Sequence, residues 1–351
     1  RRMNVGQSTT FDGLEDAALT GPAPVVVMRR RARKHFSFLF GLVVLALVVI
    51  VAVLAPLLAP HDPYVQEIPG RLMPPVWADG GMWTNMLGTD GLGRDYLSRM
   101  IYGARVSLTV GFFVAIISGL IGSSLGIIGG FFGGRVDTVI MYVVNTRLSM
   151  PALLVALALV SIVGGSLTSV TLILGFLLWD RFAVVMRSAT QQVRTNDFVL
   201  AAEAVGASKL CIIVSEVLPN VVNQMIVVAT LEMALAILGE AALSFLGLGV
   251  QSPTASWGLM VSEGRDYMFF KPYLIVIPGA AIFLLVIAIN LLGDGVRIVK
   301  FPVDVNRETN GNNSNDYPYF RLAEMYLIRA EANLRLGNPG PALADINMLR
   351  A

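Results

Sequence analysis

Long apolar segments without a charged residue constrain this chain more than any other feature of its sequence. Between residues 36 and 55, fifteen of twenty positions are Leu, Ile, Val or Phe, and none is charged. Such a segment enters a bilayer with a gain of about 5–9 kcal/mol. It is longer than the apolar core of a signal peptide and runs into Ala55-Pro56 without an A-x-A-like cleavage site. We therefore expect an uncleaved membrane-spanning helix over about 36–56.

The same criterion finds further spanning segments downstream. Residues 148–179 are uncharged but interrupted by Gly164-Gly165-Ser166, which favours two helices in a hairpin over one long helix. A hydrophobic fraction of 55% with only 14% charged residues fits a membrane protein better than a soluble domain. We predict an all-α integral membrane protein with a bundle of six helices. Their expected ranges are 36–56, 106–130, 138–163, 167–187, 221–243 and 273–293.

The distribution of Lys and Arg predicts the orientation. With a cytoplasmic N-terminus, the inside segments 1–35, 131–150, 180–220 and 294–300 carry fifteen Lys and Arg, and the outside segments carry six. The positive-inside rule then places the N-terminal tail, residues 1–35, in the cytoplasm. The cluster Arg29–Lys34 could instead bind nucleic acid, but its place directly before a spanning helix favours an anchor at the lipid headgroups. We expect no nucleic-acid partner.

Several function classes lack the residues that they need. The net charge is +2, and the chain holds one cysteine, Cys211, and two histidines, His35 and His61. A zinc site or a Cys/His nucleophile would therefore lack ligands or a base. No G-x-x-x-x-G-K-[ST] phosphate loop occurs. We expect no metal, no cofactor and no enzymatic activity, and any ATP must be bound by another chain.

Two segments carry recognisable patterns. Gly122, Gly126 and Gly130 recur at every fourth position, which lets a neighbouring helix approach closely, so we interpret them as helix-packing residues. Residues 196–219 read as a short helix, a break at Gly206 and a second helix lying at the cytoplasmic surface. Such a helix suits docking onto another protein, and an ordinary interfacial helix is the alternative.

The residues of this second segment carry a resemblance. Ala201-Ala202-x-x-x-Gly206, followed by Leu218-Pro219, resembles the cytoplasmic coupling motif of bacterial ABC-importer permeases. Further stretches are similar to the dipeptide, oligopeptide and nickel branch of that family, and the match covers about residues 29–297. These stretches are Ala55–Pro60, Leu87–Asp95, Gly103–Leu108, Leu243–Gln251 and Asn290–Arg297.

The resemblance implies a type I importer permease in the inner membrane. Its implied partners are a second homologous permease, two cytoplasmic ABC ATPases and a periplasmic substrate-binding protein. The segment 196–219 would seat on an ATPase and transmit its closure to the bundle, giving alternating access. Two positions depart from the motif, because Leu200 replaces an acid and Glu216 replaces an apolar residue. The implied coupling residues are Ala201, Ala202, Glu203, Gly206, Leu218 and Pro219.

Two acids fall inside the predicted helix 221–243. An intramembrane carboxylate costs about 2.5–3.5 kcal/mol at a helix centre, so it is first considered as functional. Glu240 falls just before the Leu243–Gln251 stretch, which suggests a place near the outer interface. For Glu232 we consider a role in the translocation path, with a protonated or pore-facing carboxyl as the alternative.

The composition changes after Arg297. Residues 306–315 contain five asparagines in ten, so 298–318 reads as a linker, and 319–351 reads as an amphipathic helical hairpin. Asn315–Ala332 with Ala342–Ala351 resembles the C-terminal segment of SusD/RagB-type lipoproteins, which implies glycan binding at the outer membrane. A TPR-like helix pair is the alternative. Because the two halves imply different compartments, we hypothesise a chimera joined near Val296–Phe301.

Two other functions stay open at this point. A glycan-binding accessory protein would rest on the tail alone, and an ATP-independent secondary transporter would be expected to show inverted repeats, which we do not detect. The cargo is not specified by the sequence. Dipeptides, longer peptides, nickel chelates and glutathione all remain candidates.

Overall fold

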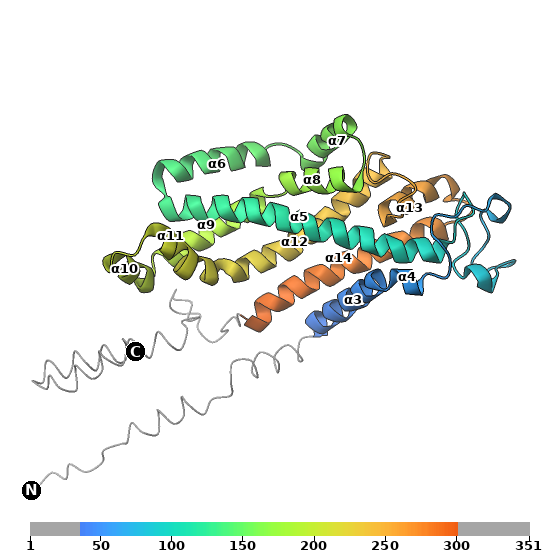
Figure 1. Ribbon diagram of the computed structural model, residues 1–351, viewed down its shortest axis with the longest axis horizontal. Helices are drawn as coiled ribbons and strands as arrows, with labels where there is room; N and C mark the ends of the chain where they lie inside the picture. The colour runs from blue at the N-terminus through green and yellow to red at the C-terminus, as the bar shows by residue number, and fades with distance from the viewer. Residues whose placement is uncertain (1–35, 301–351) are drawn as a thin grey trace, which may run out of the picture. The chain divides into compact units, whose positions relative to one another are not determined.

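The computed structural model describes residues 36–300 (Figure 1). The predicted tail 1–35, the helical hairpin 319–351 and the part of the predicted linker 298–318 beyond Lys300 lie outside the described residues. Within 36–300 the chain is helical and contains no β-strand. The helices are α3 (Phe36–Val53), α4 (Ala55–Leu58), α5 (Tyr96–Phe132), α6 (Gly134–Leu148), α7 (Ala152–Val163), α8 (Leu167–Leu177), α9 (Asp180–Arg194), α10 (Asp197–Ala204), α11 (Lys209–Ile212), α12 (Leu218–Phe245), α13 (Trp257–Gly264) and α14 (Tyr273–Lys300).

The prediction of an all-α membrane bundle is confirmed. Among the described residues, 5 helical segments are long and apolar enough to cross a membrane, and the count rises to 6 if α6 and α7 form one bent span. The remaining spans are α3, α5, α8 with α9, the run from α11 through α12, and α14. On α3, most of the apolar side chains are exposed, as expected of a helix that faces lipid.

The boundaries differ from the predicted ranges for identifiable reasons. Helix α5 begins at Tyr96 instead of 106, because the Asp95 side chain accepts a hydrogen bond from the backbone N–H of Ser98 at 2.8 Å and caps the helix. The predicted helix 138–163 is divided into α6 and α7, which meet at 79°. Pro151 stands at this break, where its missing N–H and its effect on the preceding residue end the helix.

The segment predicted as one helix over 167–187 also consists of two helices. Helix α8 ends at Leu177 and α9 begins at Asp180, although the two together make one span. The guanidinium of Arg147 on α6 donates to the carbonyl oxygen of Leu177, which is one of the acceptors left open at a helix C-terminus. An arginine from a third helix therefore caps the C-terminus of α8 at this interruption.

Helix α5 is the central element of the bundle and packs against α3, α8, α9 and α12. The three glycines of the predicted packing motif lie against α9. A Cβ atom on Gly122 would come within 2.5 Å of Phe182 Cβ, and one on Gly126 within 2.5 Å of the Ala183 carbonyl oxygen. One on Gly130 would come within 2.7 Å of the Arg187 carbonyl oxygen. Only a residue without a side chain fits at these three positions.

The connecting segments gather at the two ends of the bundle. Figure 1 shows α10 and α11 at one end, and α13 with the segment between α4 and α5 at the other. Helix α13 folds back onto the bundle, since a Cβ on Gly258 would meet Ala241 of α12 and one on Gly103 of α5 would meet Trp257. The two ends therefore present different surfaces.

Candidate coupling surface and buried charges

The segment between α9 and α12 forms an anchored turn with an exposed apolar tip. Val199, Ile212 and Val217 are buried and pack with residues of α5 and α9. By contrast, the exposed fractions are 51% for Leu200, 88% for Val205 and 72% for Leu210. Exposed apolar side chains on a buried anchor are typical of a surface that another protein covers.

Gly206 and Ser208 set the shape of this turn. Gly206 has a φ of +87°, a conformation that residues with a side chain rarely adopt, and nothing lies within 4 Å of where its Cβ would stand. The Ser208 hydroxyl accepts a hydrogen bond from the N–H of Cys211 at 3.3 Å and caps α11. A five-residue π-helical segment, Ile213–Val217, then leads into α12.

The structure brings the predicted coupling residues into this one segment. Ala201 and Glu203 are exposed and Ala202 is half-buried on α10. Leu218 packs against the buried anchor, and Pro219 lies in the first turn of α12, where its missing N–H costs no helical hydrogen bond. Of the two departures from the motif, Leu200 is exposed, and Glu216 accepts a hydrogen bond from the Ser215 hydroxyl at 3.2 Å.

Cations surround the same end of the bundle. The Arg194 guanidinium lies 5.8 Å from the ring centre of Phe131, and the Lys209 ammonium lies 5.6 Å from that of Phe132. These cation–π contacts tie the end of α5 to α9 and α11. Arg187 of α9 also forms a bidentate ion pair with Asp137 in the first turn of α6. The count over 180–220 included Arg181 and Arg187, which lie on α9 within a candidate span, so the cytoplasmic orientation stays a prediction.

The two acids of α12 have different surroundings. Glu240 lies near the α13 end and accepts hydrogen bonds of 2.7 Å from the hydroxyls of both Ser244 and Ser256. The Ser256 hydroxyl also caps α13 by accepting from the N–H of Leu259. Glu240 is therefore part of the structure that holds α13 in place.

Glu232 has no such partners. Its side chain is 0% exposed, and neither carboxylate oxygen receives a hydrogen bond from any residue that the structure describes. The nearest cationic atom is Nε of Arg181, 3.6 Å from Oε1. The structure thus separates a satisfied carboxylate from an unsatisfied one, a distinction that hydropathy could not make.

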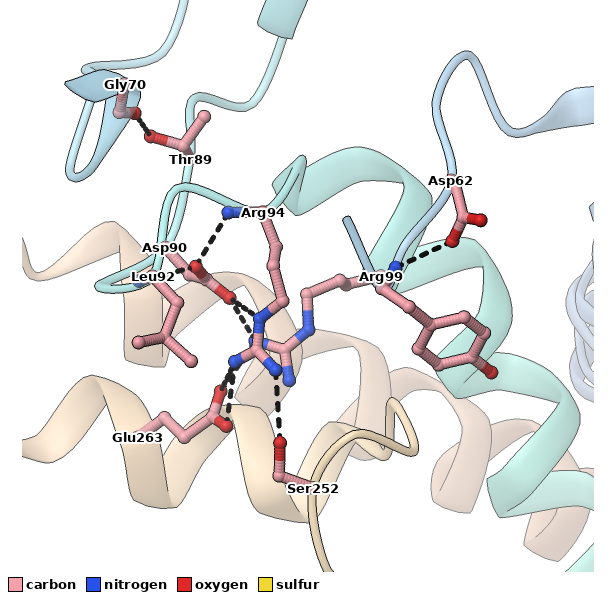
Figure 2. Close-up of polar contacts among 10 residues, drawn as sticks. Asp62, Gly70, Thr89, Asp90, Leu92, Arg94, Arg99, Ser252 and Glu263 are labelled. Carbon is pink, nitrogen blue, oxygen red and sulfur yellow. Dashed lines mark hydrogen bonds and ion pairs between the residues drawn. The ribbon is translucent and has the colours of Figure 1, made fainter. Parts of the chain in front are cut away.

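A charge cluster at the opposite end was not predicted. Figure 2 shows Arg94 and Arg99 side by side, facing Asp90 and Glu263. Arg94 donates to Asp90 at 2.7 Å and to Glu263 at 2.9 Å, and Arg99 donates to Glu263 at 2.6 Å. Ser252 accepts from Arg94 at 3.2 Å. The cluster therefore joins the segment before α5 to α13.

Burial and charge act in opposite directions on Arg94. Burial on its own lowers the pKa of the guanidinium, but the carboxylates of Glu263 and Asp90 outweigh it and raise that pKa above its ordinary value. The Arg94 guanidinium therefore stays charged beside these two carboxylates. The sequence signal was the Leu87–Asp95 stretch, which contains Asp90 and Arg94, but nothing in it pointed to Glu263.

No group of three or more His, Cys, Asp or Glu side chains within the described part of the chain could hold a metal ion. The buried charges of the described residues lie in ion pairs, in hydrogen bonds to hydroxyls or backbone N–H groups, or in the Arg181–Glu232 contact. The arrangement therefore consists of a bundle with an exposed apolar tip at one end and an ion-paired, folded-back helix at the other.

Comparison with known protein families agrees with this architecture. Residues 122–297 match the model of the binding-protein-dependent transport system inner membrane component. Residues 24–75 match the N-terminal transmembrane domain of oligopeptide transport permease C. A third match, to the SusD family, covers residues 293–351.

Three curated relatives align with this chain over most of their own length. The dipeptide transport system permease protein of Haemophilus influenzae is 39% identical over 265 residues, which is 76% of this chain and 90% of the relative. The di/tripeptide transport system permease protein of Pseudomonas aeruginosa is 40% identical over 282 residues, 80% of this chain and 93% of the relative. The probable D,D-dipeptide transport system permease protein of Escherichia coli is 38% identical over 260 residues, 74% and 85% respectively.

The spanning helices, the family matches and these relatives lead to one assignment. The chain belongs to the binding-protein-dependent transport system inner membrane components, among the ABC permeases of the peptide type.

Proposed function

We propose that this chain is one of two permease subunits of an ATP-driven importer that moves peptides inward by alternating access. Two cytoplasmic ATPases, a second homologous permease and a periplasmic substrate-binding protein complete the proposed assembly. A permease subunit is not an enzyme, and the ATP hydrolysis belongs to separate subunits. The names of the relatives support peptide cargo, and a nickel chelate is the second candidate, on the family resemblance alone.

The observation that carries the proposal is the exposed apolar tip formed by Leu200, Val205 and Leu210 around Gly206. It lies at the opposite end of the bundle from α13 (Figure 1). On this proposal Ala201, Ala202 and Glu203 contact an ATPase, and the buried anchor transmits the movement of the turn to α9 and α12. The N-terminus then lies on the same, cytoplasmic, side.

The chain carries its own probe for this arrangement. Cys211 is the single cysteine of the sequence, and it is exposed on α11. A membrane-impermeant maleimide should label Cys211 in inverted membrane vesicles and leave it unlabelled in intact spheroplasts. Assembly with the ATPases should then slow the labelling. Labelling from the periplasmic side would contradict both the topology and the docking proposal.

A second test concerns the cargo. Vesicles that contain the assembled transporter should accumulate radiolabelled dipeptide when ATP and the binding protein are both present. Uptake of a nickel chelate in preference to dipeptide would favour the second candidate. Uptake that persists without the ATPases would favour a secondary transporter and reject the proposal.

For the C-terminal segment we propose that a SusD-like fragment is joined to the permease near Val296–Phe301. The family match over 293–351 and the change in composition after Arg297 support this proposal. One continuous genomic read across the junction tests it, and an intact open reading frame there would contradict the chimera. A glycan-binding role for the tail predicts that the full chain binds oligosaccharide, which equilibrium dialysis would detect.

A further inference from the structure

Two charged side chains face each other in the middle of the bundle. Nε of Arg181, in the first turn of α9, lies 3.6 Å from Oε1 of Glu232 on α12. Neighbouring contacts to α5 fix the depth: a Cβ on Gly122 would meet Phe182, and one on Gly111 would meet Met233. Since Gly111 and Gly122 lie in the central part of α5, both charges are far from either end of the bundle.

This pair is incomplete as an internal ion pair. A charge-assisted hydrogen bond between nitrogen and oxygen measures about 2.7–2.9 Å, so 3.6 Å is long. Both oxygens of Glu232 lack a hydrogen bond within the described region, although the side chain is 0% exposed. An unsatisfied buried polar group destabilises a fold, and a charged one does so more strongly. Both residues retain hydrogen-bonding capacity that residues 36–300 do not use.

The helix interruption next to the pair brings a second carboxylate, that of Asp180, to the start of α9. Helix α9 starts at Asp180, and its N-cap residue, Trp179, makes no capping hydrogen bond through its side chain. The first N–H groups of a helix carry a partial positive charge and favour anions. The Asp180 carboxylate accepts from the N–H of Arg181 at 3.0 Å, so it occupies one of these donors. The end of α8 is capped separately by Arg147.

The exposure of Arg181 identifies the kind of surroundings. Its side chain is 51% exposed at a depth where lipid would surround a surface helix. A guanidinium that faces hydrocarbon is strongly unfavourable, so charged residues at this depth usually face a water-filled cavity or another charged group. We therefore expect the exposed side of Arg181 to face a polar environment in the assembled transporter.

We propose that Arg181 and Glu232 recognise the two charged termini of a peptide in transit. This inference rests on the importer function proposed above. The peptide carboxylate accepts hydrogen bonds from the Arg181 guanidinium, and the peptide α-ammonium donates to Glu232. The loose internal contact is exchanged for two contacts with the cargo, so no charge is left unpaired in the low-dielectric interior. The ligand class is a zwitterionic short peptide.

The test compares cargoes that differ by one terminal charge. The complete transporter is reconstituted in vesicles with its binding protein. Uptake is then measured for a dipeptide, its C-terminal amide and its N-acetyl derivative. Arg181→Gln should lower uptake of the free dipeptide about tenfold relative to the amide, compared with the same ratio in the wild type. Glu232→Gln should lower uptake of the free dipeptide about tenfold relative to the N-acetyl derivative, compared with the same ratio in the wild type. The preference of the binding protein enters every ratio equally and cancels.

Arg187→Gln is the matched control, because it also removes an ion-paired arginine from α9 but lies beside Asp137. It should leave both ratios unchanged. An equal loss for all cargoes in Arg181→Gln and Glu232→Gln would show structural damage and overturn the proposal, as would unchanged ratios. Loss of the co-purifying second permease would instead assign the pair to the subunit interface. A wild type that transports none of the cargoes would reject the importer function itself.

Discussion

Arg94 and Glu263, 169 positions apart in the sequence, are joined by a hydrogen bond of 2.9 Å between Nη2 and Oε1. Arg94 is buried in the segment before α5, and Glu263 is partly exposed on α13. Because Glu263 also accepts from Arg99, one carboxylate on α13 holds two buried guanidinium groups.

Glu263→Gln should destabilise the chain. The substitution leaves two buried arginines with Asp90 as their only carboxylate, and removing one partner of a buried pair costs about 3–5 kcal/mol. Because Glu263 is partly exposed, we expect a smaller loss, about 1–3 kcal/mol. Thermal unfolding in detergent measures it. The control is Asp266→Asn, because Asp266 is exposed beside Arg265. This variant should unfold at the wild-type temperature. Equal melting of both variants would refute the cluster's role.

Ser256→Ala should release α13 from α12. The hydroxyl caps α13 and donates to Glu240, so its loss removes a cap and leaves the buried carboxylate with one donor fewer. Together these should cost about 1–3 kcal/mol. Ser262→Ala is the comparison, because Ser262 makes one exposed hydrogen bond, to the Phe245 carbonyl. Hydrogen exchange of α13 should be faster in Ser256→Ala than in Ser262→Ala.

Gly126→Ala should force α5 and α9 apart. Its Cβ would stand 2.5 Å from the Ala183 carbonyl oxygen and 2.9 Å from the Arg187 amide nitrogen, and backbone atoms cannot rotate away. Overpacking of this kind costs about 1–3 kcal/mol. Gly279→Ala on α14 meets nothing within 4 Å and should leave stability nearly unchanged. If the two variants unfold at the same temperature, the close approach of α5 and α9 is contradicted.

Gly206→Val should reduce ATPase docking, although the new Cβ clashes with no neighbouring atom. No atom stands within 4 Å, so the effect comes from forcing a β-branched residue to a φ of +87°, at about 1–3 kcal/mol. Since 1.4 kcal/mol corresponds to tenfold in affinity, the recovered ATPase should fall about tenfold in a pull-down. Gly164→Val imposes similar strain, at a φ of +95° and also without near atoms, between α7 and α8. It should retain the ATPase, and equal losses would exclude a specific role for the turn.

Hydropathy could predict the membrane helices because lipid requires long apolar runs, whatever the tertiary contacts. It could not predict that α5 starts at Tyr96, because the first ten residues of that helix include Arg99 and Arg105 and its start depends on the Asp95 cap. It also missed the interruption at Leu178 and Trp179, where the sequence stays apolar and the break is accompanied by an arginine from another helix.

The buried charges show a second limit. The sequence marked both Glu232 and Glu240 as intramembrane acids and separated them only by depth, whereas their different contacts depend on Ser244, Ser256 and Arg181. The cluster of Arg94, Arg99 and Glu263 likewise requires α13 to fold back onto α5. Contacts between residues so far apart in the sequence depend on the tertiary structure. A single sequence has no periodicity from which to predict them.

Helix α5 is continuous over 37 residues, which gives it a length of about 55 Å, well beyond the roughly 30 Å of a bilayer core. Its N-terminal end is bound through Arg99 to Glu263, and its C-terminal half lies against the backbone of α9 at three glycines. Its 37 residues thus form one helix that contacts α13 at one end and α9 at the other. We expect a displacement of α13 at one surface to be passed along α5 to α9 at the opposite surface.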